Sequence, residues 1–219
     1  MNLSFTSSRT QLENLPVPVH VILASQSIGR RQLLEKLGVR FRVVVTNVDE
    51  ETISLQEPVK TTRARAIAKL EEILKNPRVY ALDDKAKNLV IAADSMAVLG
   101  RKVYGKADGR ESAKAMLKEL MGHTHSFITS VAAGLRDENG NVTKRWDKTA
   151  TSKVTMRKMS TAEVEMYVTR YDFTRFAGAY SLQDAPWDLI TKVDGSYTNV
   201  IGLPFEIILP VLRSQGVVA

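Results

Sequence analysis

Cysteine is absent from the 219-residue sequence, which excludes disulfide bonds and thiolate-held zinc or iron–sulfur centres. No apolar run reaches the roughly 18 residues that a membrane-spanning helix needs, so we expect no membrane partner. Four catalytic motifs are also missing: the P-loop, G-x-G-x-x-G, H-E-x-x-H and G-x-S-x-G. Kinase, dehydrogenase, zinc-protease and serine-hydrolase activities therefore have no support in the sequence.

The N-terminal stretch lacks the apolar segment of a secretory signal. Residues 1–18 are polar, carry one basic residue (Arg9) and end at two prolines. We expect a loose leader over residues 1–18, a single catalytic domain over residues 19–219 and a cytoplasmic location.

The composition is that of an ordinary globular protein, with 44% hydrophobic and 25% charged residues. The net charge of +7 has three interpretations: a solvated basic surface, a nucleic-acid surface, or a pocket for a polyanionic small molecule. The placement of individual charges has to decide between them.

Apolar patterning predicts alternating strands and helices. The first 45 residues predict a strand at 19–24, a polar turn, a helix at 28–37 and a strand at 41–45. Further along we expect a helix at 59–74, a strand at 89–93, a hairpin at 98–103, a helix at 108–121 opened by a capping box of Asp108 and Glu111, strands at 127–135 and 143–156, a helix opened by Ser160 and Glu163, and a helix at 203–212. The fold class is α/β, with a mixed twisted sheet flanked by helices and two lobes around a cleft.

The first candidate site is the polar turn after the first strand. Ser25, Ser27 and Arg30 combine hydroxyls and a guanidinium with the free N–H groups of a helix start, which together favour phosphate. The alternative is that Ser27 is a plain N-cap and the arginine is solvated.

The second candidate is acidic. Asp94 follows the apolar stretch 90–93 directly, and a buried carboxylate needs a partner charge or a metal. Glu50 lies in the acidic run 49–51 after the second strand, where carboxylates commonly hold Mg²⁺. The alternatives are a turn-capping aspartate and a solvated acidic turn.

Other polar residues are weaker candidates when each is taken alone. Lys69 lies on a predicted helix, and Lys106 follows Gly105 in a loop that suits a cation reaching a phosphate. The segment 178–183 ends in Gln183, whose amide could read base edges, or it is a core strand. His123 and His125 have no evident third metal ligand, so a structural role is the better interpretation.

Taken in order, these segments resemble the Maf family, which is related in fold to the inosine triphosphate pyrophosphatases. In the first half of the chain, residues 23–30 resemble the family's L-A-S-x-S-P-x-R motif, residues 49–50 its D-E, Lys69 its helix lysine and residues 93–95 its A-D-[ST]. In the second half, residues 105–107 resemble its G-K-P motif, residues 122–125 its G-x-T-H, residues 177–183 its A-G-x-Y-x-x-Q and residues 201–204 its V-G-L-P. The match covers about residues 21–214.

The resemblance implies metal-dependent hydrolysis of a nucleoside triphosphate to a monophosphate and pyrophosphate. Asp94 would be the catalytic carboxylate, and Glu50 and Asp94 would hold a divalent cation, Mg²⁺ or Mn²⁺. The triphosphate would be bound by Ser25, Arg30, Lys69 and Lys106. A homodimer is implied as well.

Three positions tend to follow substrate choice within the family. Ser95 and Gln183 are closer to the dTTP/UTP branch than to the 7-methyl-GTP branch, whereas Gly29 matches neither. Ile28, Ala107 and Phe176 also depart from the family pattern. The residues therefore favour pyrimidine triphosphates, with 7-methyl-GTP as the alternative.

A non-enzymatic function competes with hydrolysis. The basic charge could serve a septum-associated or nucleic-acid-binding regulator, since members of the family are associated with septum formation. Nucleic-acid binding would show a steep salt dependence and would not need Asp94. We expect a nucleotide substrate and no nucleic-acid partner.

Overall fold

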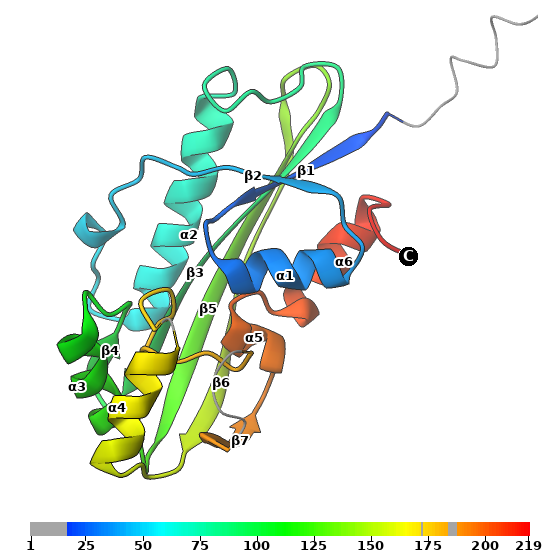
Figure 1. The fold of residues 1–219 in the computed structure, drawn as a ribbon. Helices are drawn as coiled ribbons and strands as arrows, with labels where there is room; N and C mark the ends of the chain where they lie inside the picture. Colours follow the sequence, from blue (N-terminus) through cyan, green and yellow to red (C-terminus); the bar gives the residue numbers. More distant parts are fainter. Residues whose placement is uncertain (1–16, 172, 184–187) are drawn as a thin grey trace, which may run out of the picture.

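A computed structural model describes residues 17–171, 173–183 and 188–219 (Figure 1). Its centre is a seven-stranded sheet in the order β2-β1-β3-β5-β6-β7, with β4 paired to β3. The strands are β1 (Val19–Ala24), β2 (Phe41–Val43), β3 (Lys87–Leu99), β4 (Lys102–Tyr104), β5 (Thr124–Arg136), β6 (Val142–Met156) and β7 (Ile190–Asp194). The pairs β1–β2 and β1–β3 are parallel and all others are antiparallel, so the sheet is mixed.

Helices cover both faces of the sheet. They are α1 (Ile28–Lys36), α2 (Pro58–Lys75), α3 (Arg110–Leu120), α4 (Thr161–Arg170), α5 (Tyr197–Ile201) and α6 (Phe205–Ser214), with a 3₁₀ turn at Glu50–Thr52. Figure 1 shows α2 on one face and α1 with α6 on the other. The α/β fold class with a mixed, helix-flanked sheet is therefore confirmed.

The alternation of side chains along β3 separates two cores. Leu89, Ile91 and Ala93 pack in the cluster that contains residues of α1 and α6. Val90 and Ala92 pack with residues of α2 on the opposite face. Since side chains alternate strictly along a strand, Asp94 continues the α2 face and Ser95 the α1 face.

A third core fills the other end of the sheet. It joins residues of β4, α3, β5, α4 and the segment 173–180, including Tyr104, Leu117, Phe127, Tyr167 and Tyr180. Figure 1 shows α3 and α4 together at this end, away from α1 and α6. The two groups of elements correspond to the expected two lobes.

Most predicted elements are present with small boundary shifts. The helix at 59–74 is α2, the hairpin turns at Gly100-Arg101, and Ser160 and Glu163 form the expected capping box, with Ser160 Oγ accepting from Glu163 N and Glu163 Oε2 accepting from Ser160 N. No helix in the described part of the chain is long and apolar enough to cross a bilayer. The predicted leader lies almost wholly in residues 1–16, outside the described residues.

Two expectations about local structure were wrong. The strand expected at 89–93 runs on to Leu99, because β5 pairs with β3 residue by residue, including Asp94 with Ser130. Asp108 does not cap α3: Gly109 precedes the helix, and the Ser112 hydroxyl accepts from the backbone N–H groups of Asp108 and Gly109. The closing helix is present and begins at Phe205, two residues later than expected, whereas β7 and α5 were missed.

Candidate active site

A cavity of about 620 Å³ opens beside β3 where its neighbour β1 ends. The β1–β3 register stops at Ala24 and Ala92, so the next stretch of β3 has a free edge. The cavity is lined by residues of both faces: Ser25, Ser27, Arg30, Glu50, Arg65, Lys69, Asp94, Ser95, Lys106, Phe127, Arg175, Phe176, Tyr180 and Gln183 among others. All of the predicted site residues except Gly29 line it.

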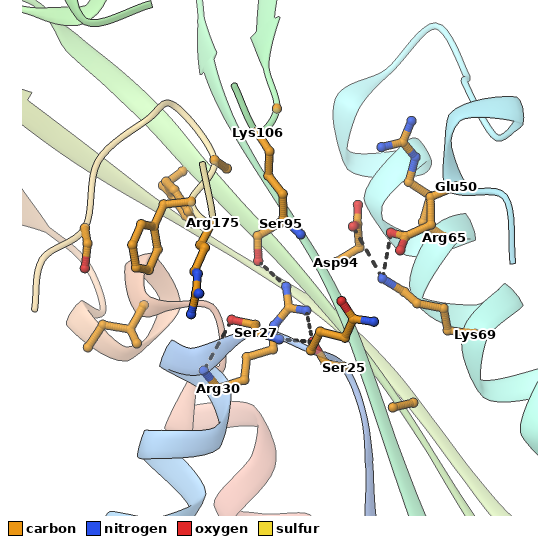
Figure 2. Close-up of a pocket in the computed structure, with 18 of the residues that line it drawn as sticks. Ser25, Ser27, Arg30, Glu50, Arg65, Lys69, Asp94, Ser95, Lys106 and Arg175 are labelled. Carbon is orange, nitrogen blue, oxygen red and sulfur yellow. Dashed lines mark hydrogen bonds and ion pairs between the residues drawn. The ribbon is translucent and has the colours of Figure 1, made fainter. Parts of the chain in front are cut away.

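On the α2 face, Lys69 links the two predicted metal ligands (Figure 2). Its Nζ donates to Glu50 Oε2 at 2.8 Å and lies 3.5 Å from Asp94 Oδ1. The side chains of Lys69 and Asp94 are 7% and 10% exposed, whereas Glu50 is 37% exposed. The carboxylates thus converge on one buried ammonium, although 44 residues separate Glu50 from Asp94 in the sequence.

The electrostatics of this triad follow from burial. Burial raises the pKa of Asp94 to about 6, against the opposing attraction of Lys69 and Arg30. Burial also lowers the pKa of Lys69, although Asp94 and Glu50 favour its charged form. The pKa of Glu50 is lowered: burial opposes this, but the charge and hydrogen bond of Lys69 outweigh it. Asp94 is thereby set apart as the more basic carboxylate.

One oxygen of Asp94 has no partner. Asp94 Oδ2 is buried and makes no hydrogen bond within the described residues. Because an unpaired buried carboxylate oxygen is costly, it calls for a ligand such as a cation or water. The orphaned oxygen beside Glu50 fits a hard divalent cation, since Mg²⁺ is commonly held by one or two carboxylates, with water and substrate phosphates completing its shell.

Arg30 is a structural clamp at the centre of the cavity. Its Nη1 donates to Ser25 Oγ at 2.8 Å and to the Ala93 carbonyl at 2.9 Å, its Nη2 to Ser95 Oγ at 2.8 Å, and its Nε to the Gly202 carbonyl at 2.8 Å. The Ala93 carbonyl lies on the edge of β3 that β1 has left unpaired. Arg30 therefore joins the turn before α1, the edge of β3 and the turn after α5.

The Arg30 contacts also account for the glycine at 202, which has φ 113°. A Cβ there would lie 3.3 Å from Arg30 Nε and 3.5 Å from Ser95 Oγ. Any side chain at position 202 would crowd Arg30 and Ser95 and disturb their hydrogen bond.

Ser25 and Ser27, in the turn before α1, both support local structure and face the cavity, so the capping and the site interpretations both apply. Ser27 is the N-cap of α1, with its Oγ accepting weakly from the Arg30 N–H at 3.4 Å. Ser25 Oγ accepts from the Ser27 N–H at 3.2 Å as well as from Arg30. Both hydroxyls line the cavity, so a capping role does not remove them from the site.

Lys106 is an exposed cation at the cavity wall. Its backbone bridges to Ala177, and the Gly178 N–H donates to the Gly105 carbonyl at 2.9 Å. This pairing ties the segment that leads to Gln183 to the turn after β4. The segment 178–183 is a loop, so the core-strand alternative is wrong.

On the α1 face, the cavity wall is more apolar. Phe176, Leu182, Val200 and Ile201 line it together with Gln183. Gly29 is buried behind this wall, where a Cβ would lie 2.9 Å from the Ile201 carbonyl oxygen. Gly29 therefore allows a close approach of α1 to α5 and does not contact the cavity directly.

The histidine pair takes the structural role expected. His125 is buried, and its Nε2 lies 2.8 Å from the Tyr180 hydroxyl. His123 is exposed, with Nδ1 3.1 Å from the Met121 carbonyl oxygen. No cluster of three histidine or acidic side chains suited to a metal was found among the residues that the structure describes.

Three lining or adjoining residues were missed from the sequence. Arg65 lines the cavity one helical turn before Lys69, and that i, i+4 spacing was the available signal. Arg175 lines it from the loop after α4, where nothing in the sequence indicated its direction. Thr129 reaches the site only through β5 pairing, which places it opposite Ser95.

Comparisons with known proteins agree with this site. A family model described as Maf-like protein matches residues 20–215. The dTTP/UTP pyrophosphatases of Thermotoga petrophila and Treponema denticola are 33% and 32% identical, covering 90% and 88% of this chain and 90% and 95% of their own lengths. A nucleoside triphosphate pyrophosphatase of Trichodesmium erythraeum is 30% identical over 90% of this chain and 94% of its own.

Among solved structures, the Staphylococcus aureus Ham1 protein aligns with a TM-score of 0.43 and 14% identity, covering 90% of this chain and 97% of its own, a likeness too loose to carry an argument. The match of the family model to nearly the whole described chain is decisive: the chain belongs to the Maf-like protein family.

Proposed function

We propose that this chain is a nucleoside triphosphate pyrophosphatase that hydrolyses dTTP, UTP or modified pyrimidine triphosphates to the monophosphate and pyrophosphate. The observation that carries the proposal is the buried pair of Lys69 and Asp94 joined to the half-exposed Glu50 at a cavity, with one Asp94 oxygen that has no hydrogen-bond partner among the described residues. The relatives named as dTTP/UTP pyrophosphatases support the reaction and the substrate class.

Asp94 acts as the proton acceptor. The oxygen of a water molecule attacks the α-phosphorus, the bond from that phosphorus to the oxygen bridging the α- and β-phosphates breaks, and pyrophosphate leaves with the bonding pair. The proton of the attacking water passes to Asp94, whose raised pKa makes it a better base than an ordinary aspartate. Lys69 holds this carboxylate beside Glu50 while balancing part of their charge.

Glu50 and Asp94 are the residues that would hold a divalent cation, Mg²⁺ or Mn²⁺. When bound, the cation would neutralise phosphate charge and polarise the α-phosphoryl group. The donor set fits because carboxylate oxygens are the ligands that such hard cations prefer.

The phosphates lie among the cations and hydroxyls of the same cavity. Lys106 is exposed and can reach them from the loop after β4, and Ser25 offers its hydroxyl from the turn before α1. Arg30 adds positive charge, but its hydrogen bonds to protein groups make positioning its main task. This division assigns catalysis to the α2 face and base recognition to the α1 face.

Gln183 supports the pyrimidine class, because an amide offers both a donor and an acceptor to the base edge. The alternative substrate is 7-methyl-GTP, which the departures at Gly29 and Phe176 leave in competition. The other alternative is a septum-associated or nucleic-acid-binding regulator. The polarity of the cavity and its unpaired carboxylate oxygen favour an enzyme over either binding role.

We also propose a catalytic domain spanning residues 19–219, a homodimer, and a cytoplasmic location, where nucleoside triphosphates are abundant. Light scattering of the purified chain tests the dimer. A single species of monomer mass at assay concentrations would contradict it.

The reaction is tested by incubating the protein with Mg²⁺ or Mn²⁺ and dTTP, UTP, CTP, GTP, 7-methyl-GTP or ITP, and separating the products. We expect monophosphate and pyrophosphate, abolished by EDTA and by Asp94→Asn in a variant with an unchanged far-UV spectrum. Orthophosphate as the product would indicate cleavage at the terminal phosphate. Turnover that survives in Asp94→Asn would overturn the assignment of the base.

A further inference from the structure

Ser95 stands in a chain of hydrogen bonds that crosses from the cavity to the core. Arg30 Nη2 donates to Ser95 Oγ at 2.8 Å (Figure 2). Ser95 Oγ lies 2.9 Å from Thr129 Oγ1, and Thr129 Oγ1 donates to the Asn199 carbonyl at 3.0 Å. Thr129 is fully buried, whereas Ser95 is partly exposed at the cavity wall.

The direction of each bond follows from counting hydrogens. A hydroxyl carries one hydrogen and two lone pairs. Thr129 uses its hydrogen on the Asn199 carbonyl, so in the bond between the two hydroxyls Ser95 is the donor. Ser95 therefore has no hydrogen left for a ligand. One of its lone pairs accepts from Arg30, and the other remains as an acceptor.

The position of Ser95 on β3 indicates which part of a bound nucleotide would contact the free lone pair of its hydroxyl. Asp94 and Ser95 are adjacent on β3, and their side chains leave opposite faces of the strand. A nucleotide reacting at Asp94 has its α-phosphate on the α2 face. Ser95 lies on the other face, where Phe176, Gln183 and Ile201 line the cavity, and this wall suits a planar base.

We propose that Thr129 is a positioning residue that makes Ser95 a pure hydrogen-bond acceptor, so that the site selects bases with a ring N–H. This inference rests on the proposed function and deepens it. Uracil and thymine carry a hydrogen on N3 and meet the lone pair of Ser95 favourably. Cytosine presents a bare N3 there, so two acceptors would face each other without a hydrogen.

Removing the Thr129 hydroxyl frees the hydrogen of the Ser95 hydroxyl and does not leave the Asn199 carbonyl without a donor. The Asn199 carbonyl also accepts from the Gly202 N–H at 2.9 Å, so it keeps a donor in Thr129→Val. Ser95 keeps its bond from Arg30, and its hydrogen is free to turn toward the cavity. The variant then accepts cytosine better and discriminates less.

The experiment measures kcat/KM for UTP and CTP in the wild type, Thr129→Val and Thr129→Ser, with Mg²⁺. One lost neutral hydrogen bond corresponds to about a tenfold change. We expect the wild type to prefer UTP, Thr129→Val to lower the UTP/CTP ratio about tenfold, and Thr129→Ser to restore it. Thr149→Val is the matched control, since Thr149 bonds Ser130, whose side chain leaves the opposite face of β5 from Thr129, so the ratio should stay unchanged.

Binding constants of non-hydrolysable UTP and CTP analogues, measured by calorimetry on the same variants, separate the two proposals. A binding ratio that shifts in Thr129→Val without turnover in any variant would keep this inference and overturn the hydrolase. Turnover in the wild type with the same UTP/CTP ratio in Thr129→Val would overturn the inference alone. Equal binding of both analogues to the wild type, or no binding, would also overturn it.

Discussion

The ammonium of Lys69 lies 2.8 Å from the carboxylate of Glu50, in an ion pair that joins the middle of α2 to the 3₁₀ turn after β2. The same ammonium is 3.5 Å from Asp94. Lys69→Met would leave two carboxylates facing each other without the ammonium that joins them. We expect kcat to fall about 100-fold, which is the lower end of the range for removing one preorganised donor that stabilises charge in a transition state.

The matched control is Lys60→Met on the same helix. Lys60 is exposed and pairs only with Glu57 among the interactions described, at 2.5 Å. Its loss should leave kcat unchanged, because exposed pairs contribute little. If both variants keep full activity in steady-state assays, the triad has no catalytic role.

Arg30 and Lys106 both line the cavity, yet their replacement should have different consequences. Arg30→Lys cannot reproduce the four bonds to Ser25, Ala93, Ser95 and Gly202. We expect it to lower the free energy of unfolding by about 3 kcal/mol and to reduce activity, because buried acceptors lose their charged donor.

Lys106→Ala should raise KM for the triphosphate about tenfold and leave the melting temperature within error, since Lys106 is exposed. Urea denaturation and steady-state kinetics on both variants test the contrast. Equal loss of stability in the two would contradict a clamp at Arg30.

Local sequence patterns are enough to predict the first strand, turn and helix of the fold. The apolar run at 19–24, the serine cap and the leucines of α1 each act within a few residues, so the sequence predicts β1, the turn and α1 at nearly the observed positions. The length of β3 was not predictable in this way. Asp94 and Ser95 look like a strand end in sequence, but pairing with Ser130 and Thr129 carries the strand past them.

The candidate site likewise contains residues that local sequence patterns predict and residues that only the tertiary structure reveals. Glu50, Lys69 and Asp94 were recognised because their residue types and motif positions carry the chemistry. The link from Ser95 through Thr129 to Asn199 was invisible, since it depends on strand register and on a five-residue helix held by tertiary contacts. For Gly29, which the resemblance marks as a specificity position, the structure adds a packing role: a Cβ there would lie 2.9 Å from the Ile201 carbonyl oxygen and 3.6 Å from Gln183 Oε1. Its part in substrate choice stays a prediction.

That packing gives a stability prediction. A Cβ on Gly29 would lie 2.9 Å from the Ile201 carbonyl oxygen and 3.0 Å from its Cγ2. Alanine normally favours a helix over glycine by about 1 kcal/mol, but overpacking against backbone costs about 1–3 kcal/mol. We expect Gly29→Ala to lower the free energy of unfolding by about 1 kcal/mol in urea titrations.

Gly105→Ala is the control for this substitution, because nothing among the described residues lies within 4 Å of a Cβ at that position and its φ lies outside the left-handed region. Gly105 is exposed and lies outside the helices, so the change should alter stability by only a few tenths of a kcal/mol. If Gly29→Ala is more stable than the wild type, α5 can move away from α1 at little cost, and the close packing of the two helices does not require glycine at position 29.

His125 makes stability depend on pH. Burial, with a smaller contribution from the charge of Lys153, lowers its pKa from 6.5 to about 4. Between these values the unfolded chain binds a proton that the folded chain refuses, so stability is lost as the pH falls from 6.5 toward 4. From pH 7 to pH 5 this group alone should remove about 2 kcal/mol from the free energy of unfolding.

The measurement is urea denaturation of the wild type and His125→Gln at both pH values. The variant should be less stable at pH 7, because the bond to Tyr180 is disturbed, and the gap should shrink by about 2 kcal/mol at pH 5. A constant gap at His125 would mean that the imidazole is protonated equally easily in both states.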